Sequence, residues 1–165
     1  MNLKRSIFYF PLIITLFFNS CSTTKKGILN QEYHTLTTKF NVLFNGKEAF
    51  SIGEEILSDA FEENFYELLP VEPINLRGEN IDETTIIPGF DRAEEKAVKA
   101  IQKHSLKIND IQYNRQIDDA YLLLGKARYF DRRFFPALEA FNFLLESPTN
   151  RNSYVEGKIW REKTN

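Results

Sequence analysis

Apolar residues recur at helical spacing in two consecutive stretches of the chain within residues 118–147. Between 120 and 130, and again between 137 and 145, they lie three or four residues apart. This spacing gathers the apolar side chains on one face of an α-helix. Asp118 is suited to cap the first helix, and Pro136 fits the first turn of the second. The pattern therefore predicts two packed helices.

The break at residues 131–133 is short, so the two helices are expected to form a hairpin over residues 117–148. This hairpin resembles a tetratricopeptide repeat, in which small residues let two helices approach and larger ones fill the space around them. Small side chains stand at two of the matching positions and large ones at three. The predicted packing residues are Tyr121, Leu124, Gly125, Ala137 and Phe141.

The same spacing predicts a first, degenerate repeat over residues 30–63. Its turn is expected at Asn45-Gly46, a dipeptide common in turns. Its predicted packing residues are Tyr33, Leu36, Phe40 and Ala49. Residues 152–165 begin a further repeat with Trp160 on its packing face. Stacked repeats need a polar cap at their ends, and this sequence stops part-way along a helix without one. We therefore expect Trp160 to be exposed and the chain to be the N-terminal piece of a longer protein or a truncated product.

Two segments separate these repeats. Residues 91–106 are predicted to form a single helix, in which Asp91 and Glu94 have capping-box spacing. Residues 64–90 form an irregular insertion that contains several prolines and glycines, and its apolar start is expected to pack on the first repeat or on a partner. The predicted fold is therefore all-α, an α-solenoid of tetratricopeptide-type hairpins with one long insertion.

Residues 1–20 are predicted to be an export signal. Two basic residues precede an apolar run that is too short for a spanning helix, and the single cysteine of the chain, Cys21, follows it. The end of this run resembles a bacterial lipobox, which implies lipid attachment to Cys21 and a flexible tether over residues 21–29. Several acyl chains would hold the protein on the membrane. The alternative is an ordinary signal peptide with an incidental cysteine. The tether lacks acidic residues, which favours the periplasmic face of the outer membrane.

Charge is unevenly distributed along the mature chain, which carries a net charge of −4 once the leader is removed. Residues 48–95 hold 14 acids and two bases, whereas residues 96–165 hold 13 bases and eight acids. This asymmetry indicates either electrostatic docking to proteins or simply solvated helix faces. The net negative charge and interleaved signs argue against nucleic-acid binding.

No pattern in the sequence predicts catalysis, a metal, a cofactor or a small-molecule substrate. His34 and His104 have no second ligand at metal-binding spacing, and Cys21 is consumed by the predicted anchor. Consecutive glutamates on a helix point about 100° apart, so they do not converge on one substrate. We expect a non-enzymatic protein.

Aromatic and basic residues cluster around the turn of the second hairpin. They are either core residues at the helix junction or a patch for docking partner proteins, since these residue types are enriched at binding hot spots. The candidate docking residues are Arg128, Tyr129, Arg132, Arg133 and Phe134.

Four segments together resemble one family. They are residues 39–46, 92–101, 119–131 and 158–165, and the resemblance extends over nearly all of the mature chain. The chain is similar to the N-terminal part of the SprE/PorW family, tetratricopeptide lipoproteins of the type IX secretion and gliding-motility machinery of Bacteroidota. The resemblance implies a periplasmic scaffold that binds other subunits of that machinery. Two other hypotheses remain: a glycan-binding lipoprotein of nutrient uptake, and a lipoprotein of outer-membrane protein assembly.

Overall fold

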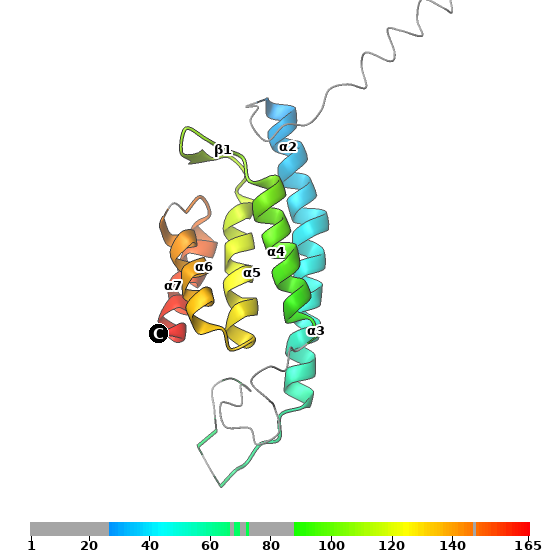
Figure 1. The fold of residues 1–165 in the computed structure, drawn as a ribbon, viewed down its shortest axis with the longest axis vertical. Coiled ribbons are helices and arrows are strands. Elements are labelled where there is room, and N and C mark those ends of the chain that lie inside the picture. Colours follow the sequence, from blue (N-terminus) through cyan, green and yellow to red (C-terminus); the bar gives the residue numbers. More distant parts are fainter. Residues whose placement is uncertain (1–26, 67, 70–71, 73–87, 147) are drawn as a thin grey trace, which may run out of the picture.

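The computed structural model describes residues 27–66, 68–69, 72, 88–146 and 148–165 (Figure 1). The predicted leader, Cys21 and most of the predicted tether lie outside the described residues, as does most of the insertion. The described part is mostly helical, which confirms the all-α class. Its elements are α2 (Ile28–Thr37), the π-helix η1 (Thr38–Leu43), α3 (Phe44–Asp59), α4 (Phe90–His104), β1 (Lys107–Ile108), β2 (Ile111–Gln112), α5 (Gln116–Phe130), α6 (Phe134–Glu146) and α7 (Arg151–Thr164).

The helices pack mainly on their neighbours in the chain. The segment α2–η1–α3 forms one long rod, and α4 returns along it before α5 runs back beside α4 (Figure 1). The α5–α6 pair forms a hairpin, and α7 packs on both of its helices. Each helix thereby covers the apolar face of the previous one, as expected of a stack of helices.

The predicted turn at Asn45-Gly46 is wrong, because both residues lie inside the helical rod. A Cβ atom on Gly46 would lie only 2.9 Å from Leu123 Cδ2 and 3.1 Å from Lys96 Cβ. The glycine therefore allows close packing against α4 and α5 instead of a reversal of the chain.

Three of the packing residues predicted for the first repeat are also wrong. Tyr33, Leu36 and Phe40 are exposed, whereas Ala49 is buried. Residues on the opposite face of the rod enter the core instead, and η1 adds to the shift because its wider turn changes which residues share a face. The buried residues of this face are His34, Thr38, Val42, Leu43, Gly46, Ala49, Phe50, Gly53 and Leu57.

Aromatic rings join the rod to the later helices. Phe90 stacks on Phe130 with ring centroids 5.3 Å apart, and Phe50 contacts both rings. Trp160 of α7 lies 5.3 Å from Tyr129, centroid to centroid. The expectation of an exposed Trp160 is therefore wrong, since its ring is partly buried against this cluster.

The α5–α6 hairpin depends on a close contact at Gly125. A Cβ atom there would lie 2.3 Å from Phe141 Cε1, so only glycine leaves room for this fully buried ring. Leu124 and Ala137 are also buried in the hairpin, and Tyr121 is partly buried.

Both predicted helix caps differ from the structure. Helix α4 begins at Phe90 after Gly89, and Asp91 Oδ1 accepts hydrogen bonds from the backbone N–H groups of Gly89 and Arg92. Its expected capping-box partner, Glu94, binds arginines instead. Helix α5 begins at Gln116, so Asp118 lies within the first turn and not at the cap.

Two features of the connections complete the described fold. A short β-hairpin, which the sequence pattern did not predict, joins α4 to α5. Its turn residues Asn109 and Asp110 both have positive φ, as a two-residue hairpin turn requires. At the start of the insertion, Phe65, Tyr66 and Leu68 are exposed, so these three side chains do not pack on the first helical rod.

Candidate functional site

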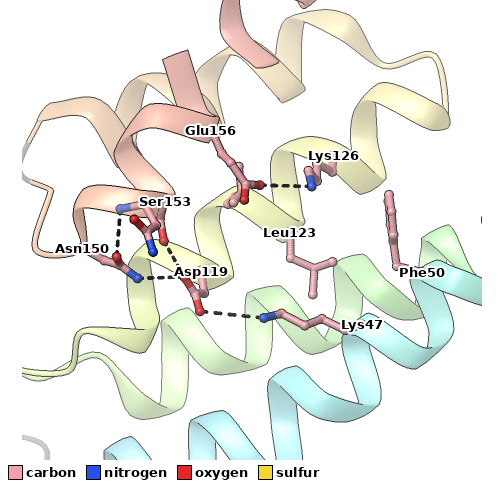
Figure 2. Close-up of a pocket in the computed structure, with 10 residues that line it drawn as sticks. Lys47, Phe50, Asp119, Leu123, Lys126, Asn150, Ser153 and Glu156 are labelled. Carbon is pink, nitrogen blue, oxygen red and sulfur yellow. Dashed lines mark hydrogen bonds and ion pairs between the residues drawn. The ribbon is translucent and has the colours of Figure 1, made fainter. Parts of the chain in front are cut away.

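A cleft of about 400 Å³ opens between α3, α5 and the start of α7 (Figure 2). Its apolar lining comes from Phe50, Leu122 and Leu123, which belong to the hydrophobic core. Charged, amide and hydroxyl side chains surround this lining. They are Lys47, Asp119, Lys126, Asn150, Asn152, Ser153 and Glu156.

Asp119 connects the three walls of the cleft. Its carboxylate accepts hydrogen bonds from Ser153 Oγ at 2.5 Å and from Asn150 Nδ2 at 3.3 Å, both at the start of α7. On the other side, Lys47 Nζ of α3 lies 3.8 Å from the same carboxylate (Figure 2). One acidic side chain of α5 thus orients groups from helices at both edges of the cleft.

A second ion pair lies further along the cleft. Lys126 Nζ is 3.4 Å from Glu156 Oε2 and 5.0 Å from the centroid of the Trp160 ring. The Lys47 and Glu156 side chains are 60% and 52% exposed. Their partners Asp119 and Lys126 are 22% and 24% exposed, so each pair has one side open to solvent, and a charged group of an incoming ligand can compete for the exposed partner.

This arrangement is suited to binding a protein segment. The apolar lining can take up a side chain, while the lysines, carboxylates and amides around it can pair with the backbone and charged groups of a protein segment. Among the described residues, no group of three or more His, Cys, Asp or Glu side chains is placed to hold a metal ion.

The predicted docking patch at the α5–α6 turn does not form an exposed aromatic and basic surface. Tyr129 is buried and Phe134 is partly buried. Arg128 Nε donates to Glu94 Oε1 at 2.9 Å, and Arg133 donates to the other oxygen of the same carboxylate. Arg132, the remaining member, lies in the turn with a φ of 60°.

Glu94 is therefore the centre of a structural ion-pair network. Its burial opposes ionisation, but the hydrogen bonds and charges of Arg133 and Arg128 outweigh this and lower the pKa of the carboxyl. Arg128 also donates to the carbonyl oxygen of Pro136 at 3.0 Å. The network ties α4 to the turn of the next hairpin, so these arginines are engaged within the molecule.

The fold brings the two histidines together although they lie far apart in the sequence. His34 Nδ1 and His104 Nδ1 are 3.1 Å apart in a buried polar cluster. Asn114 Nδ2 donates to Thr38 Oγ1 and to the carbonyl oxygen of His104 in the same cluster. One imidazole must donate to the other, and two positive rings cannot share this contact. Burial lowers the pKa of both histidines, and the charges of His34 and Lys99 lower that of His104 further.

The protein is expected to lose stability as the pH falls below about 6.5, the ordinary histidine pKa. Below this pH the histidines of the unfolded chain take up protons, whereas those of the folded chain, whose pKa values are lowered, stay neutral. The free energy of unfolding is therefore highest above this pH and falls with the pH until the lowered pKa values of the folded chain are reached. The slope can be at most about 1.4 kcal/mol per pH unit for each histidine. Urea unfolding at pH 7.5, 6.5 and 5.5 measures it.

The matched variant for this test is His104→Gln, which keeps a neutral polar side chain and removes one titrating group. We expect a flatter pH dependence between 5.5 and 7.5, a range in which ordinary carboxyl groups stay ionised. An unchanged slope in the variant would show that the histidine pair is not responsible.

The cleft was not anticipated from the sequence. Its charged residues, Lys47, Asp119, Lys126 and Glu156, come from three separate helices, and no motif in the sequence connects them. Within the described residues, no helix is long and apolar enough to cross a membrane.

No protein-family model matches the chain, and no curated protein matches it.

Proposed function

We propose that this protein is a non-catalytic scaffold that binds segments of other proteins in the cleft between α3, α5 and α7. The observation that carries the proposal is the open cleft itself, with an apolar lining and exchangeable ion pairs around it. Groups of this kind can bind a peptide through its side chains and its backbone together.

The proposed architecture is of the tetratricopeptide type for the hairpin α5–α6 and the helix α7 that follows. The close contact between Gly125 and Phe141 and the packing of α7 on this hairpin support it. The rod α2–η1–α3 departs from that architecture, because one continuous helix stands where a hairpin would be.

The proposed setting is the type IX secretion and gliding-motility machinery, at the periplasmic face of the outer membrane. The support is the resemblance of four segments of the chain to the SprE/PorW family, together with the predicted lipid attachment at Cys21. In this setting the cleft would bind a subunit of the secretion ring or translocon, and a deletion strain should lose secretion and gliding.

Reversing one charge at the rim tests the cleft directly. Lys47→Glu places a second carboxylate next to Asp119, so we expect capture of ring and translocon subunits from membranes to fall about tenfold, equivalent to 1.4 kcal/mol. Affinity purification of the tagged full-length protein, with quantitative mass spectrometry, measures it. Lys47 is exposed, so the fold should be unaffected.

The matched control is Lys158→Glu, the same exchange at an exposed position of α7 outside the cleft. It should capture these subunits as the wild type does. Equal losses in both variants, or no loss in either, would contradict the role of the cleft. Capture of barrel-assembly subunits, or micromolar binding in a glycan screen, would replace the secretion setting with one of the two other hypotheses.

A further inference from the structure

Large apolar side chains are exposed at one end of the molecule, where α2 begins. Ile28 and Leu29 in its first turn are 77% and 87% exposed, and Tyr33 and Leu36 follow Leu29 on the same helix face. Ile111 in the neighbouring β-hairpin is 57% exposed. The β-hairpin and the start of α2 lie at the same end of the molecule (Figure 1).

Basic side chains are concentrated around this end. The last turns of α4, the β-hairpin and the residue before α5 bring four exposed bases there: Lys99, Lys103, Lys107 and Arg115. Two exposed acids, Glu32 and Asp110, accompany them, and Asp110 is paired with Lys107 at 3.5 Å. An apolar surface with surplus positive charge around it is suited to an anionic lipid surface.

The opposite end has the opposite charge. From the last turns of α3 onward, the described residues expose five acids without an exposed base between them: Glu54, Glu55, Asp59, Glu62 and Glu63. An anionic surface would repel this end. The described molecule is therefore polarised along its long axis, with the basic end at the start of α2 (Figure 1).

The sequence links the basic end to the predicted lipid. Only six residues separate Cys21 from the first residue of α2, and they include Lys25 and Lys26. A fully extended chain spans at most about 3.6 Å per residue, so the start of α2 stays within about 25 Å of the acylated residue. The exposed apolar turns are thus the part of the described fold held nearest to the bilayer.

We propose that this end of the protein, formed by the first turns of α2 and the β-hairpin, rests on the anionic lipid surface and orients the molecule on the membrane. Ile28, Leu29 and Ile111 enter the headgroup region, and Lys103 and Lys107 contact lipid phosphates. The acidic end then points away from the membrane. This inference rests on the anchored state in the proposed function.

The test uses the lipidated full-length protein, purified from membranes and reconstituted into vesicles of phosphatidylethanolamine and phosphatidylglycerol. Acylation blocks the Cys21 thiol, so an added cysteine is the only site for a fluorescent label. Leu29→Cys probes the proposed contact, whereas Ser58→Cys and Ile159→Cys probe exposed positions at the acidic end and on α7. Lipids carrying a nitroxide quencher in the acyl chain should quench the label at position 29 several-fold more than either other label.

A charge-reversal variant tests the electrostatic part. Each lysine near an anionic surface contributes roughly fivefold to its attraction, so Lys103→Glu with Lys107→Glu should lower quenching at position 29 to the level of the other two labels. The anchor is unaffected, so the variant should still float with the vesicles.

The results separate this inference from the anchor. Flotation with equal quenching at positions 29 and 58, or with none at 29, overturns the inference and leaves the anchor intact. Protection of position 29 by a bound protein or a second copy, without quenching, also overturns it. Failure to float, or a reactive Cys21, overturns the anchor and the inference together.

Discussion

Phe141→Ala is expected to lower the free energy of unfolding by about 3–5 kcal/mol. The ring is fully buried between α5 and α6, and it fills the space that Gly125 leaves open. A methyl group in its place would leave a cavity that the two helices cannot close without losing their other contacts. Since domains of this size are stable by only about 5–15 kcal/mol, the variant should be unfolded in a substantial fraction of molecules at moderate temperature.

Phe135→Ala is the matched control, because it removes the same side chain from the same helix at a position that is 84% exposed. We expect a change within about 0.5 kcal/mol. Urea unfolding followed by far-UV circular dichroism measures both variants. If the two midpoints shift equally, the α5–α6 contact does not have the importance that its packing indicates.

The helices α5 and α6 could be predicted from the sequence because their signals are local. Apolar periodicity, a proline in the first turn of α6 and small residues at the contact all lie within about thirty residues. The close approach at Gly125 needs no distant partner, since Phe141 belongs to the next helix. Helix α4 could also be predicted from its periodicity, although its capping could not.

The first repeat could not be predicted in the same way, because its sequence allows two interpretations. Asn45-Gly46 is common in turns, but a glycine inside a helix is equally required where another helix approaches closely. Only the positions of Lys96 and Leu123, both far along the chain, decide between them. The exposed face with Phe40 and the buried face with Val42 are both apolar, so periodicity could not show which one is covered.

The cleft and the histidine pair depend on contacts between distant parts of the chain. Asp119 meets Ser153 of α7 and Lys47 of α3, and His34 meets His104. The sequence shows the residue types at these positions but not their distances. The two interpretations of the aromatic and basic cluster at the α5–α6 turn stayed open for the same reason, since the sequence does not show the connection between Glu94 and the arginines that it binds.

Asp118 holds the start of α7 in place from the first turn of α5. Its carboxylate oxygen Oδ2 accepts hydrogen bonds from the backbone N–H groups of Thr149 and Asn150, both at 2.6 Å, and from Thr149 Oγ1 at 3.0 Å. The side chain is buried, and a negative charge in the first turn of a helix is favourable. This connection positions Asn150 and Ser153 at the cleft.

Asp118→Ala is therefore expected to cost about 3 kcal/mol, because it leaves two backbone donors without their charged acceptor. The damage should be local: the amide protons of Thr149 and Asn150 should exchange faster with solvent, while those of α4 stay protected. Hydrogen-exchange mass spectrometry and urea unfolding measure these two effects. Asp59→Ala is the control, since that side chain is exposed at the last residue of α3 and its loss should be nearly neutral. If the amide protons of Thr149 and Asn150 exchange at the same rate in both variants, the role of Asp118 is contradicted. The predicted loss at α7 would also weaken partner capture as Lys47→Glu does, because the groups around Asp119 would no longer be held together.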